Sequence, residues 1–331
     1  MQRILNDPDF IVEDYLKGFL KAHGDIVAPA GSSRAVKRAD EGGSHVGIVT
    51  GGGSGHEPAF IGYIGENLCD AAAVGEVFSS PTAAAFLEAF RAADHGKGVA
   101  CLYGNYSGDN MNVKMAAKMA KKEGIEVRMA VTNDDVPSAP KAESEKRRGL
   151  AAGLLNWKCC GAKSAQGASL DEVMAVAKKV SDHARSVGIG LSPCTLPGAE
   201  RPNFEIREGT MEIGIGHHGE PGMEVTSLES ASGMAKRMTE IILSDFPLER
   251  GDEVAVLVSG LGAAPLMELY ALYAEVEGLL GEQGVVIHRS YVGNYVTSLE
   301  MNGVTLTIMK LDDELKELID MPCYSVGLKQ R

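Results

Sequence analysis

The sequence carries little positive charge. Its 32 Lys and Arg residues are outnumbered by 45 Asp and Glu residues, which gives a formal net charge of -13. Proteins bind nucleic acids and anionic membranes through basic patches, so this balance argues against both as partners. A small phosphorylated ligand stays compatible with it, because backbone amides can hold phosphate without a basic patch.

The chain also lacks a long apolar run and a paired cysteine motif. No stretch of about 18 apolar residues is present, and the N-terminal segment does not have the pattern of a signal peptide. We therefore expect a cytoplasmic protein. The six cysteines are scattered and form no C-x-x-C pair. We expect reduced and mostly buried thiols, with no metal or disulfide framework.

Apolar runs typical of strands alternate with longer segments of helical spacing. Strands are predicted at 46–49, 99–102, 125–131, 211–215, 254–258, 285–288 and 304–309. Helices are predicted at 110–122, from 169 onward, around 228–241 and at 265–273. This alternation favours the α/β class, with largely parallel or mixed sheets and an active site in the cleft between loops.

A change of pattern after residue 188 indicates a domain boundary. Prolines punctuate this stretch, and its periodicity is weak. We predict an N-terminal α/β domain over 1–187 and a C-terminal α/β domain over 188–331, and we allow the last residues to pack back on the first domain.

Two of the predicted helices carry informative patterns. Ser169 and Glu172 have the spacing of a capping box. Met111, Met115 and Met119 recur at helical spacing, and we interpret them as the core face of their helix.

The first glycine-rich segment, Gly-Gly-Gly-Ser-Gly-His-Glu-Pro at 51–58, follows a predicted strand. In open α/β sheets, ligands bind at the carboxyl ends of strands. The segment lacks the Gly-Lys-Ser/Thr ending of a P-loop, and His56 stands where the dinucleotide fingerprint has its third glycine, so nucleotide binding here is disfavoured. His56 is either a base or a structural residue that caps a helix or holds a loop.

The second segment, Gly-Ile-Gly-His-His-Gly-Glu-Pro-Gly at 214–222, has two adjacent histidines. Its glycines let His217 and His218 approach a ligand closely. Neighbouring side chains on an extended segment face opposite ways, so we expect one imidazole in the site and the other turned aside. No third ligand stands at metal-binding spacing, and we expect no metal here. A structural role for both histidines stays open.

A third segment, Asn-Tyr-Ser-Gly-Asp-Asn at 105–110, leads from a predicted strand into a helix. Asp109 is either the N-cap of that helix or a carboxylate that accepts a hydroxyl proton or orients a histidine.

At these residues the chain resembles the substrate-binding (K) subunit of dihydroxyacetone kinase. The resemblance extends over nearly the whole length, through 51–58, 75–81, 105–109, 147–149, 214–222, 260–262, 292–295 and 310–315. It implies two α/β domains and a homodimer. It also implies a transferase of glycerol metabolism that works with a phosphotransferase system or with ATP, where a separate L subunit phosphorylates the bound ketose.

The resemblance also implies roles for individual residues. His218 attacks the ketone carbonyl and forms a covalent hemiaminal, His56 is the acid or base, and Asp109 lies close by. The positions that match substrate-binding residues are Gly53, Ser54, Gly55, Ser80, Gly104 and His217. This chain is expected to bind no cofactor and no metal, and the nucleotide and Mg are expected on the L subunit.

A covalent bond fits the size of the substrate. A triose has about six heavy atoms, and even ~1.5 kcal/mol per atom caps its binding near ~9 kcal/mol. A neutral imidazole adds to a ketone and strengthens this binding, whereas glycerol has no carbonyl and is excluded.

Three positions depart from the family pattern. Gly104 stands where a lysine is usual, His217 where an aliphatic residue is common, and Phe60 where histidine is common. We hypothesise that Gly104 vacates volume and that His217 offers a polar group, so that a tetrulose such as erythrulose is admitted. The alternative is that dihydroxyacetone remains the substrate.

Two other functions compete with a kinase subunit. Some relatives bind dihydroxyacetone and act on a transcription regulator as non-catalytic sensors, although such a sensor has no need of His56 and Asp109. An unrelated hydrolase or lyase would turn over without a partner. The sequence does not name the phosphoryl donor.

Overall fold

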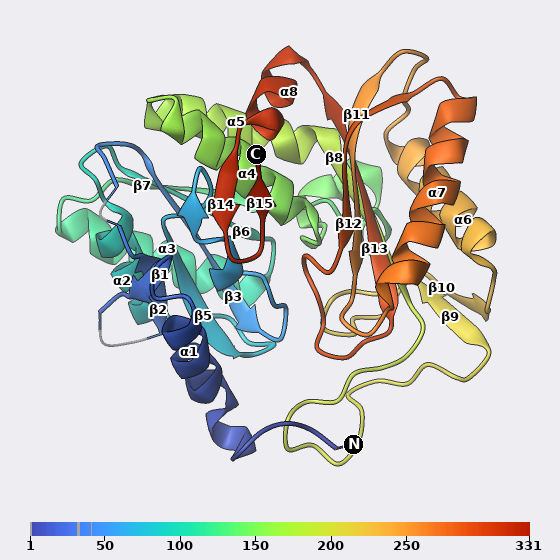
Figure 1. The fold of residues 1–331 in the computed structure, drawn as a ribbon, viewed down its shortest axis with the longest axis horizontal. Coiled ribbons are helices and arrows are strands. Elements are labelled where there is room, and N and C mark those ends of the chain that lie inside the picture. The colour runs from blue at the N-terminus through green and yellow to red at the C-terminus, as the bar shows by residue number, and fades with distance from the viewer. Residues whose placement is uncertain (1, 32–33, 41) are drawn as a thin grey trace.

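Two six-stranded β-sheets stand side by side in the computed structural model, which describes residues 2–31, 34–40 and 42–331 (Figure 1). The first sheet and its helices run from blue to green, and the second runs from yellow-green to red. The α/β class with parallel and mixed sheets is confirmed.

The first sheet has a parallel centre and an antiparallel edge. Its order is β1-β2-β5-β3-β6-β7. The strands are β1 (Val27–Pro29), β2 (Ala35–Arg38), β3 (Gly47–Ser54), β5 (Ala71–Val77), β6 (Val99–Gly104) and β7 (Val127–Thr132). β5, β3, β6 and β7 are parallel, while β2 is antiparallel to β1 and β5. The carboxyl ends of the parallel strands therefore meet at one edge.

Helices cover both faces of this sheet. α2 (Ala83–Ala93) and α3 (Ser107–Lys122) pack on one face, and α4 (Ala152–Ala165) and α5 (Leu170–His183) pack on the other. α1 (Ile11–Ala22) contacts β1. The capping box that starts α5 is confirmed, because Ser169 accepts the N–H of Glu172 and Glu172 accepts the N–H of Ser169.

The prediction that the methionines of α3 form its core face is wrong. Met111, Met115 and Met119 are 67%, 57% and 36% exposed, and the helix instead buries the smaller residues Val113, Ala116 and Ala120. Helical spacing shows that residues share a face but not which face turns inward. Here the short side chains face the sheet and allow the helix to pack closely against it.

The second sheet is mainly antiparallel. Its order is β10-β9-β8-β13-β11-β12. The strands are β8 (Ala184–Gly190), β9 (Thr210–Ile213), β10 (Glu224–Ser227), β11 (Glu253–Gly260), β12 (Val286–Gly293) and β13 (Gly303–Leu311). Only β11 and β12 pair in parallel. A largely parallel sheet is thus found in the first half alone, because the short 294–302 connection reverses the chain and places β13 antiparallel to β11.

Helices α6 (Ala231–Asp245) and α7 (Leu266–Glu282) lie on the outer side of the second sheet (Figure 1). Short 3-10 helices occupy Pro8–Phe10, Ile61–Tyr63, Val136–Ser138 and Lys141–Lys146.

The C-terminal residues return to the first half. α8 (Asp313–Asp320) contacts α4, and β14 (Cys323–Ser325) pairs with both β15 (Lys329–Gln330) and β4 (Gly65–Glu66). The domain division predicted between 187 and 188 falls inside β8, and it stays a prediction.

All six cysteines are buried and free, as the absence of a paired motif indicated. Over the described ranges, no helix is both long and apolar enough to cross a lipid bilayer.

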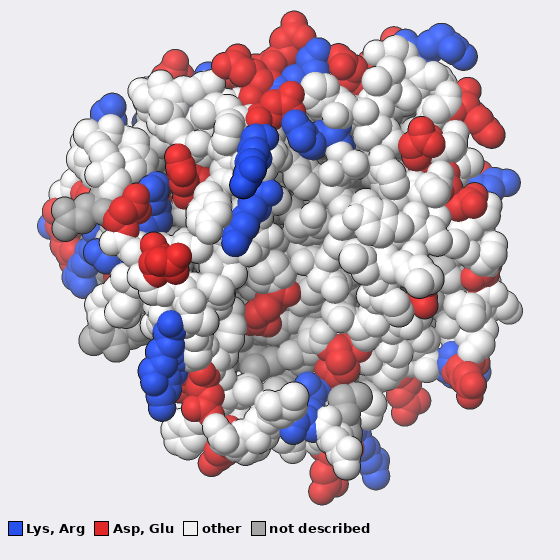
Figure 2. Space-filling model, viewed as in Figure 1, with Lys and Arg blue, Asp and Glu red and all other residues white. Residues whose placement is uncertain are grey.

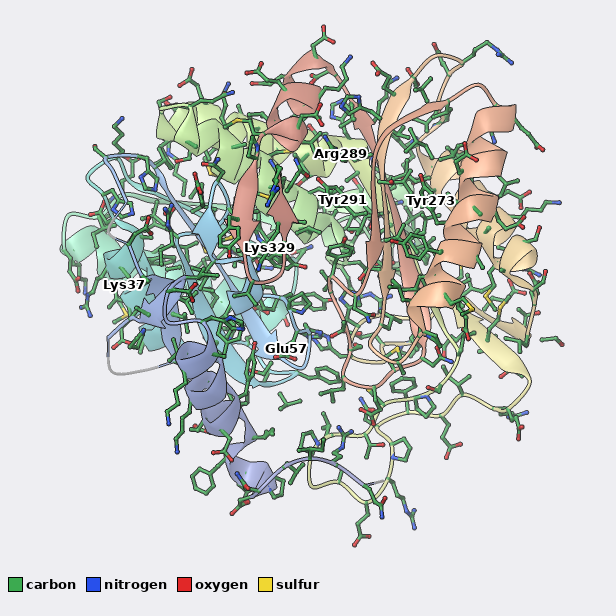
Figure 3. All side chains as sticks on the ribbon, viewed as in Figure 1. Lys37, Glu57, Tyr273, Arg289, Tyr291 and Lys329 are labelled. Atoms are coloured by element: carbon green, nitrogen blue, oxygen red, sulfur yellow. The ribbon has the colours of Figure 1, made fainter. Side chains whose placement is uncertain are left out.

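On the face shown in Figure 2, acidic and basic side chains are intermixed, and the middle of the face is largely uncharged. In the same view, Glu57 lies toward the space between the two sheets, and Lys37 lies on the outer side of the first sheet (Figure 3). The centre of the molecule, between the sheets, is where the predicted site residues gather.

Candidate functional site

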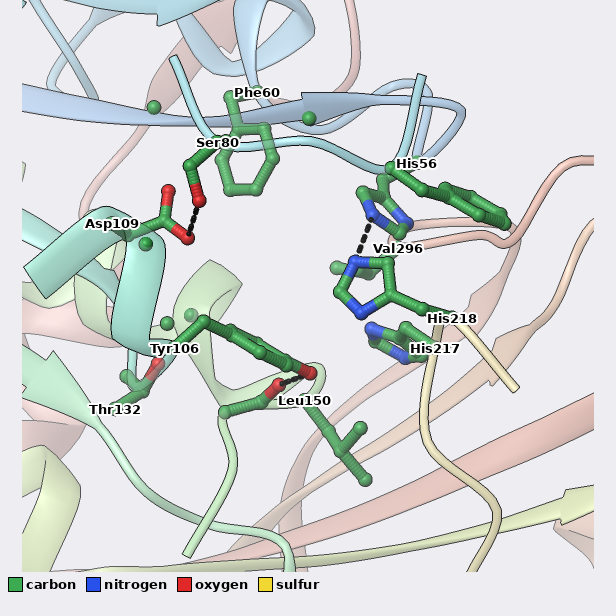
Figure 4. Close-up of a pocket in the computed structure, with 18 of the residues that line it drawn as sticks. His56, Phe60, Ser80, Tyr106, Asp109, Thr132, Leu150, His217, His218 and Val296 are labelled. Carbon is green, nitrogen blue, oxygen red and sulfur yellow. Dashed lines mark hydrogen bonds between the residues drawn. The ribbon is translucent and has the colours of Figure 1, made fainter. Parts of the chain in front are cut away.

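A cavity of about 220 Å³ lies where the carboxyl ends of β3, β6 and β7 face the 217–218 segment of the second half (Figure 4). The start of α3, part of α4 and the segment after β5 complete its wall. Seven of the predicted site residues line it: Gly53, His56, Ser80, Gly104, Asp109, His217 and His218.

The first glycine-rich segment is part of a strand and not a loop. β3 continues to Ser54, so residues 51–53 pair with β5. A Cβ on Gly52 would lie 2.1 Å from the Phe60 ring, and one on Gly53 would lie 2.7 Å from the backbone N of Ser79. The missing side chains let Phe60 and the segment after β5 press against the strand at the cavity floor.

Two predicted substrate contacts are turned away from the cavity. Ser54 donates its hydroxyl to the carbonyl of Gly75 at 2.9 Å. The N–H of Gly55 donates to the carboxylate of Glu57. Within the described residues, neither Ser54 nor Gly55 belongs to the cavity lining, because the strand pleat and the turn that follows direct both inward to the protein.

His56 is held by the second half of the molecule. Its Nδ1 lies 2.7 Å from the carbonyl oxygen of Thr297, and the side chain is 4% exposed. A carbonyl oxygen only accepts, so Nδ1 carries the hydrogen and Nε2 presents its lone pair. Burial lowers the pKa of His56 well below its usual value, and the nearby histidines lower it further. His56 is therefore a neutral imidazole and caps no helix.

Phe78 supports His56 from a strained backbone position. Its φ is 55°, in the left-handed region that bulky residues avoid. Its ring stacks on His56 with centroids 5.1 Å apart and meets His218 edge-on at 5.2 Å. These two ring contacts of Phe78 fix the planes of both imidazoles.

Both histidines of the second segment face the cavity, so the expectation that one turns aside is wrong. The N–H of Gly219 donates to the carbonyl of Gly216 at 3.1 Å, which closes a turn around His217 and His218. Side chains alternate only along extended chain. In a turn, neighbouring side chains can share a side, and both rings line the pocket (Figure 4).

His218 is oriented by Glu220. The carboxylate accepts from Nδ1 of His218 at 2.8 Å and from its backbone N–H at 2.9 Å. Burial raises the pKa of Glu220, but the hydrogen bond and charge of His218 outweigh it and bring the value to about 2. The ionised carboxylate keeps the hydrogen on Nδ1 and leaves Nε2 for chemistry.

Nε2 of His218 lies 3.1 Å from Nε2 of His56 (Figure 4). Each ring carries its other hydrogen on Nδ1, so two neutral rings would set lone pair against lone pair. A hydrogen bond at this distance needs one additional proton shared by the pair. The lowered pKa of His56 disfavours a proton on its own ring, and the Glu220 carboxylate lies on the His218 side of this contact.

His217 is the most isolated of the three imidazoles. It is 5% exposed, and its Nε2 has no hydrogen-bond partner among the described residues. Burial lowers its pKa to about 3, with His218 adding to the effect. Its carbonyl oxygen accepts from the hydroxyl of Ser298. The ring is therefore a neutral polar group whose Nε2 is free to form a hydrogen bond with a ligand.

Asp109 faces the histidines across the cavity (Figure 4). It lies in the first turn of α3, whose N-cap is Tyr106, so the N-cap alternative is wrong. Oδ2 accepts from the Ser80 hydroxyl at 2.6 Å, while Oδ1 is buried without a partner in the described structure. Burial raises the pKa of Asp109, which makes it a stronger base than an exposed aspartate.

Tyr106 fills the space beside Gly104. A Cβ at Gly104 would lie 3.1 Å from the Tyr106 ring, and a Cβ on Gly149 would lie 2.8 Å from the Cα of Gly104. The Tyr106 hydroxyl donates to the Gly149 carbonyl at 2.9 Å, and its ring meets His218 edge-on. The volume that the hypothesis assigned to Gly104 is therefore taken by Tyr106 and by close backbone packing.

Sequence reasoning gave no role to Glu220, Tyr106, Phe78 and Thr297. A signal for Glu220 was present, because a Glu-Pro pair closes both histidine segments. Thr297 had none, since its carbonyl contacts a histidine 241 residues away.

Comparisons with known proteins agree with this geometry. Residues 17–327 match the family model of the Dak1 domain. The chain is 43% identical over 314 residues to the dihydroxyacetone-binding subunit of PTS-dependent dihydroxyacetone kinase 1 from Listeria innocua, covering 95% of each chain. It is 39% identical to a D-erythrulose kinase from Mycolicibacterium smegmatis, covering 100% of this chain and 58% of that longer protein.

A solved structure, a dihydroxyacetone kinase operon co-activator, superposes with a TM-score of 0.90 at 31% identity, over 96% of this chain and 99% of that one. The extent and identity of these matches show that the chain belongs to the Dak1-domain family of dihydroxyacetone kinase subunits.

Proposed function

We propose that this chain captures a short-chain ketose as a hemiaminal on Nε2 of His218 and presents one of its hydroxyls for phosphorylation by a separate nucleotide-binding subunit. The observation that carries this proposal is the Glu220–His218–His56 arrangement. If both rings were neutral, their two Nε2 lone pairs would face each other. That arrangement supplies a nucleophile and an acid from a single shared proton.

The capture step follows from these contacts. The shared proton moves from Nε2 of His218 to Nε2 of His56, and the freed lone pair attacks the carbonyl carbon. The carbonyl π electrons move to oxygen, which takes the proton from His56 and becomes a hydroxyl. His218 is then an alkylated imidazolium with its hydrogen still on Nδ1, and the Glu220 carboxylate stabilises that charge.

Asp109 suits the other end of the substrate. His56 is engaged at the carbonyl end, whereas Oδ1 of Asp109 is an unpartnered acceptor across the cavity. It accepts the proton of the hydroxyl that attacks the phosphoryl group, and Ser80 holds it in place through Oδ2.

The substrate is dihydroxyacetone or a tetrulose. The relative from Listeria is named as dihydroxyacetone-binding, and the relative from Mycolicibacterium as a D-erythrulose kinase. The unpartnered Nε2 of His217 supports the longer ketose, since it can bond to one further hydroxyl.

The nucleotide and its Mg are proposed to sit on the partner L subunit, with this chain itself acting as a homodimer. The backbone of residues 51–53 is engaged in pairing with β5, so the first glycine-rich segment is not a phosphate-cradling loop. This supports a phosphoryl donor supplied from outside the chain.

Native mass spectrometry tests the capture. The wild-type protein is expected to gain the mass of one ketose, His217→Ala is expected to keep the adduct, and His218→Ala is expected to lose it. Loss in His217→Ala with retention in His218→Ala would mean that the nucleophile is misassigned.

A ligand sensor is the second candidate, favoured by the TM-score of 0.90 to the operon co-activator. Both functions need the hemiaminal, so phosphorylation separates them. The wild-type chain supplied with a Dak1-family L subunit and its donor is expected to form ketose phosphate. Capture without any product would identify a sensor.

A further inference from the structure

A second cluster of ligand-type side chains lies at the opposite end of the first sheet. His45 lies two residues before β3, Asp70 directly before β5, and His95 between α2 and β6. The catalytic cavity lies at the carboxyl ends of these strands, whereas this cluster lies at their amino ends. The two groups are therefore separated by the length of β3 and do not share a residue.

The three side chains converge on a common point. Nε2 of His45 is 2.9 Å from Oδ1 of Asp70, and Nε2 of His95 is 3.9 Å from the same oxygen. One ligand atom from each residue lies within 4.8 Å of the others. A tetrahedral ion with Zn–N distances of about 2.0–2.1 Å holds its ligands about 3.3 Å apart. Small side-chain movements are enough to close the cluster on one ion.

Neighbouring backbone groups orient these ligands. Nδ1 of His45 lies 2.6 Å from the carbonyl oxygen of Gly43, which places its hydrogen on Nδ1 and turns the Nε2 lone pair toward Asp70. Oδ2 of Asp70 accepts the N–H of Ile48 at 2.8 Å, which leaves Oδ1 toward the imidazoles. Metal-ligating histidines and carboxylates are held by such outer contacts.

Nε2 of His45 and Nε2 of His95 both lie near Oδ1 of Asp70, and a cation between these ligand atoms would stabilise the cluster. A proton shared by His45 and Asp70 is one such cation. One proton satisfies only the His45–Asp70 contact, whereas a metal ion satisfies all three groups.

Arg38 is the neighbour that opposes a cation. Its Nη1 lies 3.5 Å from Oδ1 of Asp70. The guanidinium is already bound by the carboxylate of Asp40 through two hydrogen bonds of 2.7 and 2.6 Å. This pairing offsets much of its charge, and Arg38 still leaves one side of Asp70 to the imidazoles.

We propose that His45, Asp70 and His95 form a binding site for a first-row transition metal ion, with Zn²⁺ the preferred occupant. Two imidazoles and one carboxylate suit Zn²⁺ or Co²⁺, whereas Mg²⁺ and Ca²⁺ select oxygen ligands. The ion joins three segments that are far apart in the sequence, so it stabilises the folded chain and takes no part in ketose chemistry.

Metal titration of the metal-free, untagged full chain tests this site. Zn²⁺ at about 100 times its Kd is expected to raise the melting temperature by about 5 °C, with no rise for Mg²⁺. Co²⁺ is expected to give the visible d–d absorption of a four-coordinate ion. His95→Ala is expected to lose both signals, and His95→Gln repeats the test with a polar side chain if the alanine variant unfolds.

The catalytic histidines are the competing binders, and His218→Ala distinguishes them. This variant is expected to keep the Zn²⁺ shift and the Co²⁺ absorption. The proposal is overturned if the wild-type chain shows neither signal, or if His218→Ala loses them while His95→Ala keeps them.

Discussion

Each of the two histidine segments contains a Glu-Pro pair, and the glutamate forms the same local contact in both. Glu57 accepts the N–H of Gly55, and Glu220 accepts the N–H of His218, in each case two residues earlier. The histidine stands one residue before Glu57 but two residues before Glu220. The Glu220 carboxylate, which folds back on the residue two positions earlier, therefore contacts His218. The Glu57 carboxylate folds back in the same way but contacts Gly55 and not His56.

This shift of one residue separates the chemistry of the two rings. Nδ1 of His218 donates to a carboxylate, while Nδ1 of His56 donates to the neutral carbonyl of Thr297. Glu220 has its pKa lowered to about 2, whereas burial raises the pKa of Glu57. The Glu220 carboxylate stabilises positive charge that forms on His218, whereas His56 has no carboxylate partner and passes the proton on. Similar motifs thus yield a nucleophile and its proton partner.

The largest expected effect comes from removing the charge at Glu220. Glu220→Gln is expected to slow hemiaminal formation by about 10³-fold, because the imidazolium formed on His218 loses its carboxylate. Stopped-flow binding of dihydroxyacetone measures the rate. Glu57→Gln is the matched control, and an equal loss in both variants would contradict a special role for Glu220.

Asp109→Asn is expected to act at the other end of the cavity. Capture should proceed at close to the wild-type rate, while phosphorylation with the L subunit should fall by about 10²-fold or more, since the base for the hydroxyl is gone. A coupled kinase assay and the binding rate give the two values. If capture falls as much as turnover, Asp109 serves the histidine pair instead.

His217→Leu is expected to change selectivity. The buried Nε2 has no other partner in the described structure, so its loss should lower kcat/KM for erythrulose about 10-fold relative to dihydroxyacetone. Parallel assays with both ketoses measure the ratio. An unchanged ratio would leave the tetrulose without a recognition residue.

The smallest expected effect concerns stability in acid. The pKa of Glu220 is lowered from 4.5 to about 2, so its contribution to folding is complete above about pH 4.5 and is lost as the pH falls toward 2. Urea unfolding of the wild type and Glu220→Gln should therefore show a stability gap at neutral pH that closes in this window. A gap that stays constant with pH would show that the charge is not responsible.

The sequence indicated β3, β6, β7, β9, β11, β12 and β13, the capping box and the histidines because each has a local signature, but it did not indicate β5 and β8. Side-chain partners are set by contacts across the fold, so the sequence around His56 does not indicate that its Nδ1 contacts the carbonyl of Thr297. The prediction that the methionines of α3 lie in the core was wrong for a related reason, since periodicity does not show which face of a helix packs. The shared orientation of His217 and His218 depends on a turn that glycines permit but do not specify.

The bond between the ketose and His218 is tested most directly by NMR with dihydroxyacetone labelled with ¹³C at its carbonyl carbon and protein labelled with ¹⁵N in histidine. The account predicts that the bound carbonyl signal moves to the tetrahedral-carbon region and couples to a single imidazole nitrogen, Nε2 of His218. A bound ketose that keeps its carbonyl signal and shows no coupling to nitrogen would contradict it.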